Sequence, residues 1–590
     1  GVHASVRPSA PAPAPPRRPM EDSPAPEAAL LAQPPAPRAS RAVRLRRLTE
    51  RRACLGCLGC GLALALAMVF VMPAVIRSTV RQGIRGDVVI DSAKADGFKQ
   101  FANRGTDGKN SIEFFFFDII NPEAVLAGRP PQVKELGPWV YDSYQVRGDF
   151  DWHPNNDTLA YREHSYFVFN AAATAERTDG RITHDRVPVT TLNLLFYGMR
   201  PLIGRAYWHL ACDILLWNSD FKRLFTNRTV HEYITGYTVD INLLGFRIPI
   251  AFPGLYPNVS RSEDPNWTQK SVMRVGAHDL DQTYEMTTWQ GMSSVEIKCP
   301  WGSLNVPFAA YCPSKFPCCG SKRVPVWGTA RNESVWDVDA NLVHGRNGEQ
   351  FAPGVEKGDE LVIFNDIIWR ALRFQNADEE EVWFKGIKML RFTPVSTTFM
   401  NASEHPSNAR YYQFGPRGLF GNLTMIEQGV PLFASLPHFL HGDPRLLEGV
   451  KGLAPDKELH QMHIDVEPIL GQTMVEHVRA QVNGQLIPGE NWGWDTWFPH
   501  VQSGTYVPIA WFDMISEISD AGADEFKQIY TAHAAEQIFS WFGAAVALIC
   551  SALLALAVHT RYYYRDGFQD LDDAQSYASN DETDNRVQLA

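Results

Sequence analysis

Two long runs of apolar residues without charged side chains stand near opposite ends of the chain, at 54–76 and 538–558. A helix needs about 20 such residues to cross the hydrocarbon core of a membrane. Both runs reach that length, and the polar sequence between them contains no other run of this kind. The pattern predicts a two-pass membrane protein with transmembrane helices at 53–76 and 538–558 and a single large domain at 77–537.

Basic residues around the first run predict which side of the membrane that domain occupies. Seven arginines precede the run (Arg38, Arg41, Arg44, Arg46, Arg47, Arg51 and Arg52), and three follow it within a similar distance (Arg77, Arg81 and Arg85). Loops that are rich in Lys and Arg stay in the cytoplasm. We therefore expect both termini to be cytoplasmic and the middle of the chain to be lumenal or extracellular.

A cleaved signal peptide is the alternative interpretation of the first run. The apolar core of such a peptide has only about 7–15 residues, followed by a small-x-small cleavage site. The first run is longer, and no clear site of this kind follows it before Arg77. These two features favour an uncleaved membrane anchor.

The middle of the chain contains seven Asn-x-Ser/Thr triplets without Pro at the second position. They begin at Asn156, Asn227, Asn258, Asn266, Asn332, Asn401 and Asn422. Such triplets are acceptors for N-linked glycans in secreted regions. Together with the charge asymmetry, they predict a glycosylated ectodomain.

Both tails have compositions that cannot form a packed core. Residues 1–52 begin with a Pro/Ala tract, and residues 559–590 are acidic. We expect both to be disordered. Three cysteines lie at the start of the first run, directly after the basic segment: Cys54, Cys57 and Cys60. Thiols at this position are candidates for S-acylation, although they could also be small residues that pack within a helix.

Short strand-like segments recur through the middle of the chain. Aromatic and apolar residues alternate between 137 and 170, on both sides of a turn at 153–157. Further short runs lie at 247–252, 361–364, 389–392 and 506–512, each bounded by Gly, Pro or Asn. Such runs are typical of strands, and no alternation of strand and helix suggests a parallel sheet. The pattern predicts an α+β fold built on an antiparallel sheet or barrel.

One segment of this region has helical spacing. Apolar residues at 207–215 recur every three or four positions, which is typical of one buried helix face. Thr229 and Glu232 form the sequence of a capping box, and Gly236 would end the helix that it opens. The turn between the two helices would expose Phe221, Lys222 and Arg223 as a cationic, partly apolar knob. A solvated helix end is the alternative.

Composition narrows the class of protein. Apolar residues make up 45% of the chain and aromatic residues 12%, so there is ample material for a large core. The formal net charge of -11 argues against a nucleic-acid partner.

The pattern of chemically active residues favours no catalytic centre, metal site or cofactor. Two His-x-x-His pairs, His438/His441 and His460/His463, have the spacing of metal ligands, but neither lies in a His-Glu-x-x-His motif. We interpret them as structural. No nucleophile elbow, phosphate-binding loop or dinucleotide motif is present. An ectoenzyme remains an alternative only through residues that are distant in sequence.

Several ordered motifs resemble those of the class B scavenger receptor family. In chain order, they are FDIINPEAV at 117–125, KELGPWVY at 134–141, FPGLYPN at 252–258, SLPHFL at 435–440, HIDVEPILG at 463–471 and VPIAW at 507–511. The resemblance spans roughly residues 60–560. It implies an antiparallel β-barrel ectodomain with a helical apex and an internal apolar tunnel that runs toward the membrane. It also implies that Phe221, Lys222 and Arg223 lie at the ligand-binding apex.

The cysteines depart from the pattern of that family. Its vertebrate members carry paired cysteines just before the SLPHFL motif, whereas this chain has none between 411 and 433. Instead, Cys299, Cys312, Cys318 and Cys319 cluster in a Pro-rich segment, and Cys212 stands alone. We expect disulfides among the four clustered residues, with the pairing open. A zinc site is the alternative.

The resemblance and the membrane topology lead to one functional hypothesis and one alternative. The chain is expected to be a receptor that binds lipids or lipoprotein-like ligands and passes apolar lipid to the membrane through a tunnel in the ectodomain. The alternative is an endolysosomal sorting or particle-recognition receptor for a protein partner, without lipid transport. Expected partners are membrane lipids, fatty acids or sterols, lipoprotein-like particles, a protein ligand and a second copy of the chain. The expected location is the plasma membrane or the endolysosomal membrane.

Overall fold

The computed structural model describes residues 56–560 with several gaps. Residues outside the description are 1–55, 57–58, 65, 68–70, 108, 198–222, 244–245, 253, 256–266, 300–330, 337, 379, 412–414, 424–430, 487–497, 525, 528–530, 532–533, 535–536, 540 and 561–590. The chain divides into two compact units. One is Phe70–Trp541, which we call the central unit; the other combines Gly1–Val69 with Phe542–Ala590.

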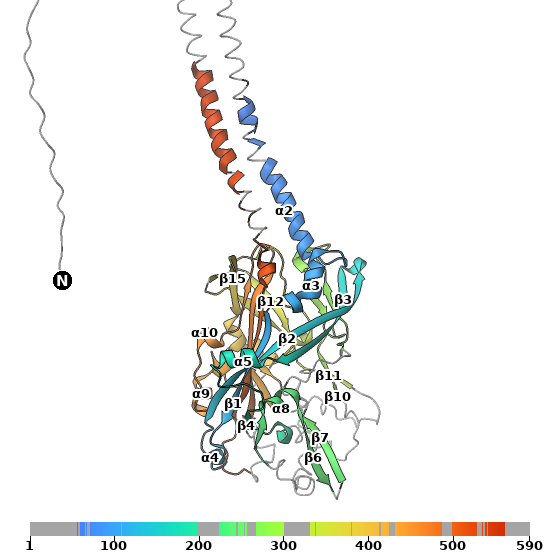
Figure 1. The fold of residues 1–590 in the computed structure, drawn as a ribbon, viewed down its shortest axis with the longest axis vertical. Helices are drawn as coiled ribbons and strands as arrows, with labels where there is room; N and C mark the ends of the chain where they lie inside the picture. The colour runs from blue at the N-terminus through green and yellow to red at the C-terminus, as the bar shows by residue number, and fades with distance from the viewer. Residues whose placement is uncertain are drawn as a thin grey trace, which may run out of the picture. The chain divides into compact units, whose positions relative to one another are not determined.

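A large antiparallel sheet of fourteen strands forms the central unit (Figure 1). Its main path has the order β12-β13-β15-β18-β19-β20-β1-β2-β3-β8-β9, with β14, β16 and β17 attached at its side. The strands are β1 (Lys109–Ile119), β2 (Val133–His153), β3 (Thr158–Phe169), β8 (Ser271–Arg274), β9 (Met286–Thr288), β12 (Glu360–Asn365), β13 (Arg370–Gln375), β14 (Glu381–Phe384), β15 (Ile387–Pro394), β16 (Leu419–Asn422), β17 (Leu432–Ser435), β18 (His463–Val466), β19 (Thr473–Leu486) and β20 (Thr505–Glu517).

The segment around Arg346 connects the two ends of this path. Arg346 forms β-bridges with Glu285, next to β9, and with Ile363 in β12. Its backbone N–H donates to the carbonyl of Val362, and its carbonyl accepts from the N–H of Phe364. The sheet is therefore nearly barrel-like, as predicted, because both edge strands share one bridging segment.

In the described part of the chain, three two-stranded ribbons and several helices accompany the sheet. The ribbons are β4 (Pro188–Leu192) with β5 (Phe225–Thr229), β6 (Tyr237–Leu243) with β7 (Phe246–Phe252), and β10 (Glu296–Cys299) with β11 (Arg331–Ser334). The helices are α2 (Met72–Val88), α3 (Asp96–Asp107), α4 (Pro122–Leu126), α5 (Ala171–Arg177), α8 (Val230–Thr235), α9 (Pro444–Gly449) and α10 (Lys457–His460), with 3-10 turns η2 (Pro154–Asn156), η3 (Leu280–Gln282), η6 (Val338–Asn341), η7 (Ser396–Phe399), η8 (Pro406–Arg410) and η9 (Pro437–Phe439).

The central unit has two distinct ends. Helices α2 and α3 lie at one end, which we call the base, and α4 and the β6–β7 ribbon lie at the other (Figure 1). Helix α3 packs against β2, and α2 packs against α3. The segment that follows β20 also lies at the base, since Phe526 shares a hydrophobic cluster with Val88 of α2.

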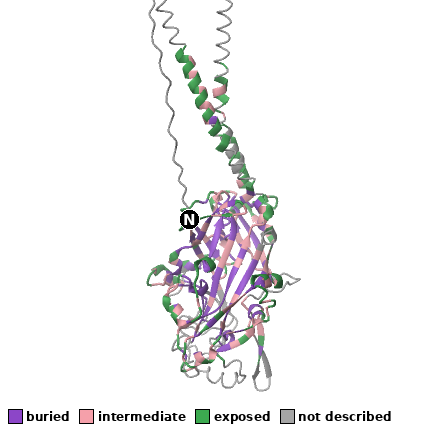
Figure 2. Cartoon of the chain, turned by 60° about the vertical axis from the view of Figure 1, so that its left-hand side comes forward, coloured by how far each residue is buried: buried purple, intermediate pink, exposed green. Residues whose placement is uncertain are grey.

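The main hydrophobic core follows the long strands (Figure 2). In β1, the closely spaced residues Phe114, Phe116 and Phe117 are all at most 2% exposed. A strand that is buried on both faces reads as a continuous apolar run rather than as an alternation. Phe116 and Phe117 are consecutive and therefore point to opposite faces of the sheet, so the burial of both shows that both faces of β1 are covered there.

Several locally encoded predictions are confirmed. The strand-turn-strand pattern at 137–170 is the hairpin of β2 and β3, with η2 as its turn. Asp157 follows η2 in the left-handed conformation (φ 55°), which Asp tolerates better than most residues. Its carboxylate accepts hydrogen bonds from the backbone N–H groups of Ala277 and His278. The short runs at 247–252, 361–364, 389–392 and 506–512 lie in β7, β12, β15 and β20.

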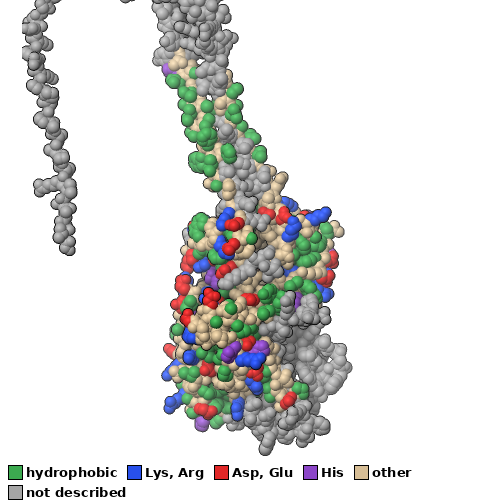
Figure 3. Space-filling view, viewed as in Figure 1, with side chains coloured by type: hydrophobic (Ala, Val, Ile, Leu, Met, Phe, Trp, Pro, Cys, Tyr) green, Lys and Arg blue, Asp and Glu red, His purple; other side chains and the backbone are tan. Residues whose placement is uncertain are grey.

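One helix among the described residues is long and apolar enough to cross a membrane, at Gln537–Thr560. It contains the second predicted span, and hydrophobic side chains cover most of its visible face (Figure 3). Of the first predicted span, residues 53–55, 57–58, 65 and 68–70 lie outside the description. Gly61 of the first apolar run and Cys550 of the second belong to the same unit. A Cβ atom added to Gly61 would lie 3.3 Å from Cys550 Sγ, so the two runs approach closely at this point.

Candidate functional site

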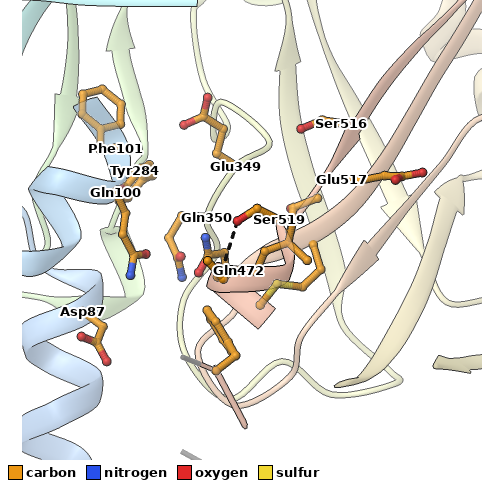
Figure 4. A pocket seen from close by; sticks show the side chains of 16 residues that line it. Asp87, Gln100, Phe101, Tyr284, Glu349, Gln350, Gln472, Ser516, Glu517 and Ser519 are labelled. Carbon is orange, nitrogen blue, oxygen red and sulfur yellow. Dashed lines mark hydrogen bonds between the residues drawn. The ribbon is translucent and has the colours of Figure 1, made fainter. Parts of the chain in front are cut away.

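A cavity of about 320 Å³ opens at the base of the central unit. Asp87 of α2 and Phe101 of α3 line one side, and the end of β20 with the segment that follows it lines the other (Figure 4). The complete lining is Asp87, Gln100, Phe101, Tyr284, Glu349, Gln350, Gln472, Thr473, Met474, Ser516, Glu517, Ile518, Ser519, Ala521, Gly522 and Phe526. The cavity thus lies between the two segments through which the chain enters and leaves the central unit.

A buried hydrophobic cluster holds these two segments together. It contains Val88, Ile387, Met389, Leu470, Met474, Val475, Ala523 and Phe526. Burying an aliphatic or aromatic side chain of this size contributes about 1.5–3 kcal/mol. The position of the cavity therefore follows from the packing of α2 and of the segment after β20 against β15 and β19.

A buried cation fixes the inner wall of the cavity. The side chain of Arg147 in β2 is 3% exposed; its Nε lies 2.9 Å from Glu163 Oε1, and its Nη1 lies 3.0 Å from Glu349 Oε2. Its guanidinium also lies 4.1 Å from the ring centre of Phe101. Burial alone would lower the pKa of Arg147, but Glu349 and Glu163 raise it above its ordinary value. Arg147 therefore stays charged and ties α3, β3 and Glu349 together.

The wall of the cavity is mixed in character. Phe101, Met474, Ile518 and Phe526 supply apolar surface, whereas three carboxylates and several amides supply polar groups. Part of the polar wall is already engaged: Gln350 Nε2 donates to the carbonyl groups of Phe351 and Leu470. Such a wall suits a molecule that has a polar and an apolar part.

The histidines of the two His-x-x-His pairs are held by structural contacts. His438 Nδ1 accepts a hydrogen bond from the N–H of Ala454, so the neutral ring carries its proton on Nε2 and donates it to Glu135 Oε2 at 2.5 Å. Trp511 Nε1 donates to the same oxygen at 2.7 Å. Burial would raise the pKa of Glu135, but the bonds from His438 and Trp511 lower it.

The other three histidines also make contacts within the fold. The ring of His460 stacks on that of His438 with 4.4 Å between centres, and burial lowers the pKa of His460 to about 4. His463 stacks on His477 at 4.8 Å, and burial together with Arg391 lowers its pKa to about 3. His441 Nε2 lies 2.6 Å from Gln461 Oε1. In the described part of the chain, no group of three or more His, Cys, Asp or Glu residues is arranged to hold a metal ion.

Two of the three predicted apex residues fall outside the described part of the chain. They are Phe221 and Lys222; Arg223 is exposed, and its carbonyl accepts a hydrogen bond from Asn193 Nδ2 at 3.0 Å. The neighbouring capping box is confirmed, because Thr229 and Glu232 cap α8 reciprocally and Gly236 follows its end with φ 97°. The assignment of Phe221, Lys222 and Arg223 to a ligand-binding apex stays a prediction.

The predicted modification sites are described in part. Asn156 and Asn227 are exposed, and Asn401 is half-buried. Asn332 and Asn422 lie in β11 and β16, and Asn258 and Asn266 fall outside the described residues. Cys299 ends β10, and Cys60 is exposed with a free thiol; Cys54, Cys57, Cys312, Cys318 and Cys319 are not among the described residues. Glycosylation, disulfide pairing and S-acylation stay predictions.

Sequence reasoning missed the residues that build the base cavity. Arg147 and Glu349 are 202 positions apart, and no motif marks either of them. The sequence offered one signal. Arg147 lies in a predicted strand, and a charged residue on a buried strand face needs a partner of opposite charge. The partner itself comes from a loop between distant strands.

The fold defines a class of protein: a nearly barrel-like antiparallel domain followed by an apolar helix. The chain belongs to the CD36 family, whose sequence profile matches residues 58–558. It is 25% identical over 448 residues to scavenger receptor class B member 1 of Bos taurus, covering 75% of this chain and 76% of that protein. It is 25% identical to sensory neuron membrane protein 1 of Ostrinia furnacalis (68% and 71% covered) and 23% identical to lysosome membrane protein 2 of Rattus norvegicus (63% and 68% covered).

Proposed function

We propose that this protein is a membrane receptor that binds lipids or lipoprotein-like ligands and transfers apolar lipid to the membrane through its ectodomain. The observation that carries this proposal is the base cavity, which lies between the segments that connect the central unit to the two predicted membrane spans. Relatives named scavenger receptors and membrane proteins support a receptor rather than an enzyme. No catalytic role is part of the proposal.

The physical advantage of such a route lies in the cost of exposing lipid to water. Each methylene group that leaves an apolar environment costs about 0.8 kcal/mol, so freeing a long acyl chain costs on the order of 10 kcal/mol. A conduit that ends at the membrane surface removes most of this barrier. In this proposal, ligands dock at the apex, apolar cargo passes through the barrel, and the mixed wall of the base cavity delivers an amphipathic molecule to the bilayer.

Reversing the charge of the apex is expected to weaken ligand binding. In the variant that combines Lys222→Glu with Arg223→Glu, two cations that would attract carboxylate or phosphate groups become anions. We expect cells that express this variant to bind fewer particles containing anionic lipid, while the protein keeps its amount and its thermal stability. Lys457→Glu, at an exposed cation in α10, is the control. If the double variant and Lys457→Glu bound these particles equally well, Lys222 and Arg223 would not belong to the ligand-binding site.

Filling the base cavity is expected to block transfer without affecting binding. Ala521 lines the cavity, and Ala521→Trp would place an indole ring in it. We expect cells with this variant to bind particles normally but to take up less of a fluorescent cholesteryl ester or fatty acid. Asp524→Trp, three residues further along at an exposed position outside the lining, is the matched control. Unchanged uptake by Ala521→Trp, with normal binding, would favour a recognition or sorting receptor without lipid transport.

A further inference from the structure

The wall of the base cavity carries charge of one sign only. Three of its 16 lining residues are acidic, and none of the 16 is Lys, Arg or His. The acidic residues are Asp87 of α2, Glu517 at the end of β20 and Glu349 of the inner wall (Figure 4). A polar group that enters the cavity therefore meets carboxylates from three separate parts of the chain.

The cation behind this wall, Arg147, has no donor left for a ligand. A guanidinium group carries five N–H donors. Nε donates to Glu163 at 2.9 Å, Nη1 donates to the carbonyl of Phe101 at 2.8 Å and to Glu349 at 3.0 Å, and Nη2 donates to Gln145 Oε1 at 3.1 Å and to Glu349. All five donors are thus used within the wall, so Arg147 cannot bind the head group of an anionic lipid.

Uncharged groups supply the rest of the polar wall. They are the amides of Gln100, Gln350 and Gln472 and the hydroxyl groups of Thr473, Ser516 and Ser519. Amide and hydroxyl groups can both donate and accept hydrogen bonds, whereas a carboxylate only accepts them. Next to the apolar surface of the same cavity, these groups match a hydroxyl or ester group on an apolar body.

We propose that the base cavity accepts lipids whose polar group is uncharged and rejects lipids whose polar group is an anion. An anionic group would leave water for a wall without an available cation and would lie close to like charges, and both effects disfavour it. A hydroxyl group can instead donate to a carboxylate, and a hydroxyl or an ester can accept from an amide. Neutral lipids such as sterols and glycerides therefore fit the cavity, and ionised fatty acids do not.

A cationic head group is the other occupant that carboxylates could attract. The inner wall argues against it, because Glu349 already accepts two hydrogen bonds from Arg147. Arg147 stays charged and lies 4.1 Å from the ring centre of Phe101, which lines the cavity. A cation in the cavity would face this fixed positive charge, whereas an uncharged polar group meets no like charge.

This inference deepens the proposed function: as a statement about delivered cargo it rests on lipid transfer, whereas the charge selectivity of the cavity can be measured by itself. The test uses two photoreactive lipids with the same diazirine-bearing alkyl chain, one ending in a hydroxyl group and one in a sulfonate, which stays ionised throughout. The purified full-length protein in phosphatidylcholine nanodiscs is illuminated with each probe, and labelled residues are identified by mass spectrometry. Labelling of the apolar helix Gln537–Thr560 is the internal reference for each probe.

In the natural chain, we expect the alcohol to label residues of the base cavity and the sulfonate to label them about ten-fold less, relative to the reference helix. Glu517→Gln is expected to raise sulfonate labelling relative to alcohol labelling, and Glu517→Gln with Asp87→Asn to raise it further. Asp524→Asn is the matched control, because it removes an exposed carboxylate outside the lining. Ala521→Trp is expected to reduce labelling by both probes, and thermal unfolding verifies that each variant is folded.

Four results would overturn the inference: equal labelling of the cavity by the two probes, labelling by neither, an unchanged ratio in Glu517→Gln and in the double variant, or an equal rise in Asp524→Asn. A third probe that ends in a quaternary ammonium group tests the cationic alternative, and stronger labelling by it than by the alcohol would overturn the assignment to uncharged lipid.

Cellular uptake of a fluorescent cholesteryl ester tests the proposed function separately. Charge discrimination in the cavity without any uptake would remove lipid transfer and keep the selectivity. Uptake without discrimination would remove this inference alone.

Discussion

Replacing Arg147 by methionine is expected to destabilise the central unit strongly. The change leaves Glu163 and Glu349 facing each other in a buried site without their cation. It also removes the hydrogen bond from Arg147 Nη1 to the carbonyl of Phe101 and the contact with the ring of that residue. Removing one partner of a buried ion pair costs about 3–5 kcal/mol. Since domains are stable by only about 5–15 kcal/mol, this is a large fraction of the total.

The measurement is the yield and the thermal unfolding midpoint of the full-length protein, followed by fluorescence-detected size-exclusion chromatography. Arg373→Met is the matched control, because Arg373 pairs with Glu360 across β12 and β13 at the surface, where its side chain is 58% exposed. An exposed pair contributes about 0–1 kcal/mol. Arg147→Lys is expected to fall between the two variants, since lysine keeps the charge but not the planar fork of donors. Equal midpoints for Arg147→Met and Arg373→Met would contradict the role of the cluster.

Features encoded by neighbouring residues were predictable from the sequence. The β2–β3 hairpin follows from alternating aromatic residues around a Pro-Asn-Asn turn, and α8 follows from the capping box of Thr229 and Glu232. In both cases the deciding contacts join residues only a few positions apart. The nearly barrel-like sheet has no such local signal, because pairings such as β1 with β20 join distant segments. Its closure was implied by the family resemblance instead.

Two sets of contacts show why sites were harder to predict than strands. Tyr144 and Tyr166 lie within the predicted strand pattern at 137–170, but alternation alone does not tell which face of a hairpin is covered. Only the register of β2 and β3 places the two rings side by side, and only the packing of α2 near the end of β20 forms the base cavity. Residues that meet through tertiary contacts leave no spacing signal in the chain.

The family motifs acquire a physical meaning from their contacts. His438 of the SLPHFL motif bonds Glu135 of the KELGPWVY motif, and Trp511 of the VPIAW motif bonds the same carboxylate. In the HIDVEPILG motif, Glu467 accepts hydrogen bonds from the N–H groups of Ile469 and Leu470 and thereby fixes a turn. Three motifs that are far apart in the sequence therefore meet at the carboxylate of Glu135, which gives His438 a structural role.

Acid is expected to destabilise the central unit because two of these histidines are held neutral. Burial lowers the pKa of His460 to about 4 and that of His463 to about 3. An unfolded chain protonates histidine near pH 6.5. Between about pH 6.5 and pH 4, the unfolded state therefore binds more protons than the folded state, and stability falls as the pH falls. The stabilisation is fully present above that window, and each proton of difference changes the free energy of unfolding by about 1.4 kcal/mol per pH unit.

Thermal unfolding of the full-length protein at about pH 7, 5.5 and 4.5 measures this effect. We expect the midpoint to fall across this series, and His463→Phe to reduce the fall because its ring keeps the stacking position on His477 but cannot take up a proton. His153→Phe is the control, since the His153 side chain is 49% exposed at the end of β2.

Arg391, His477 and Arg479 lie near His463 and disfavour its protonated form, so they add to the effect of burial. A midpoint that rises toward acid, or an identical slope in His463→Phe and the natural chain, would show that this buried histidine does not control the acid response. If the slope is confirmed, the part of the fold that weakens in acid lies around His463 and His477, where β18 pairs with β19.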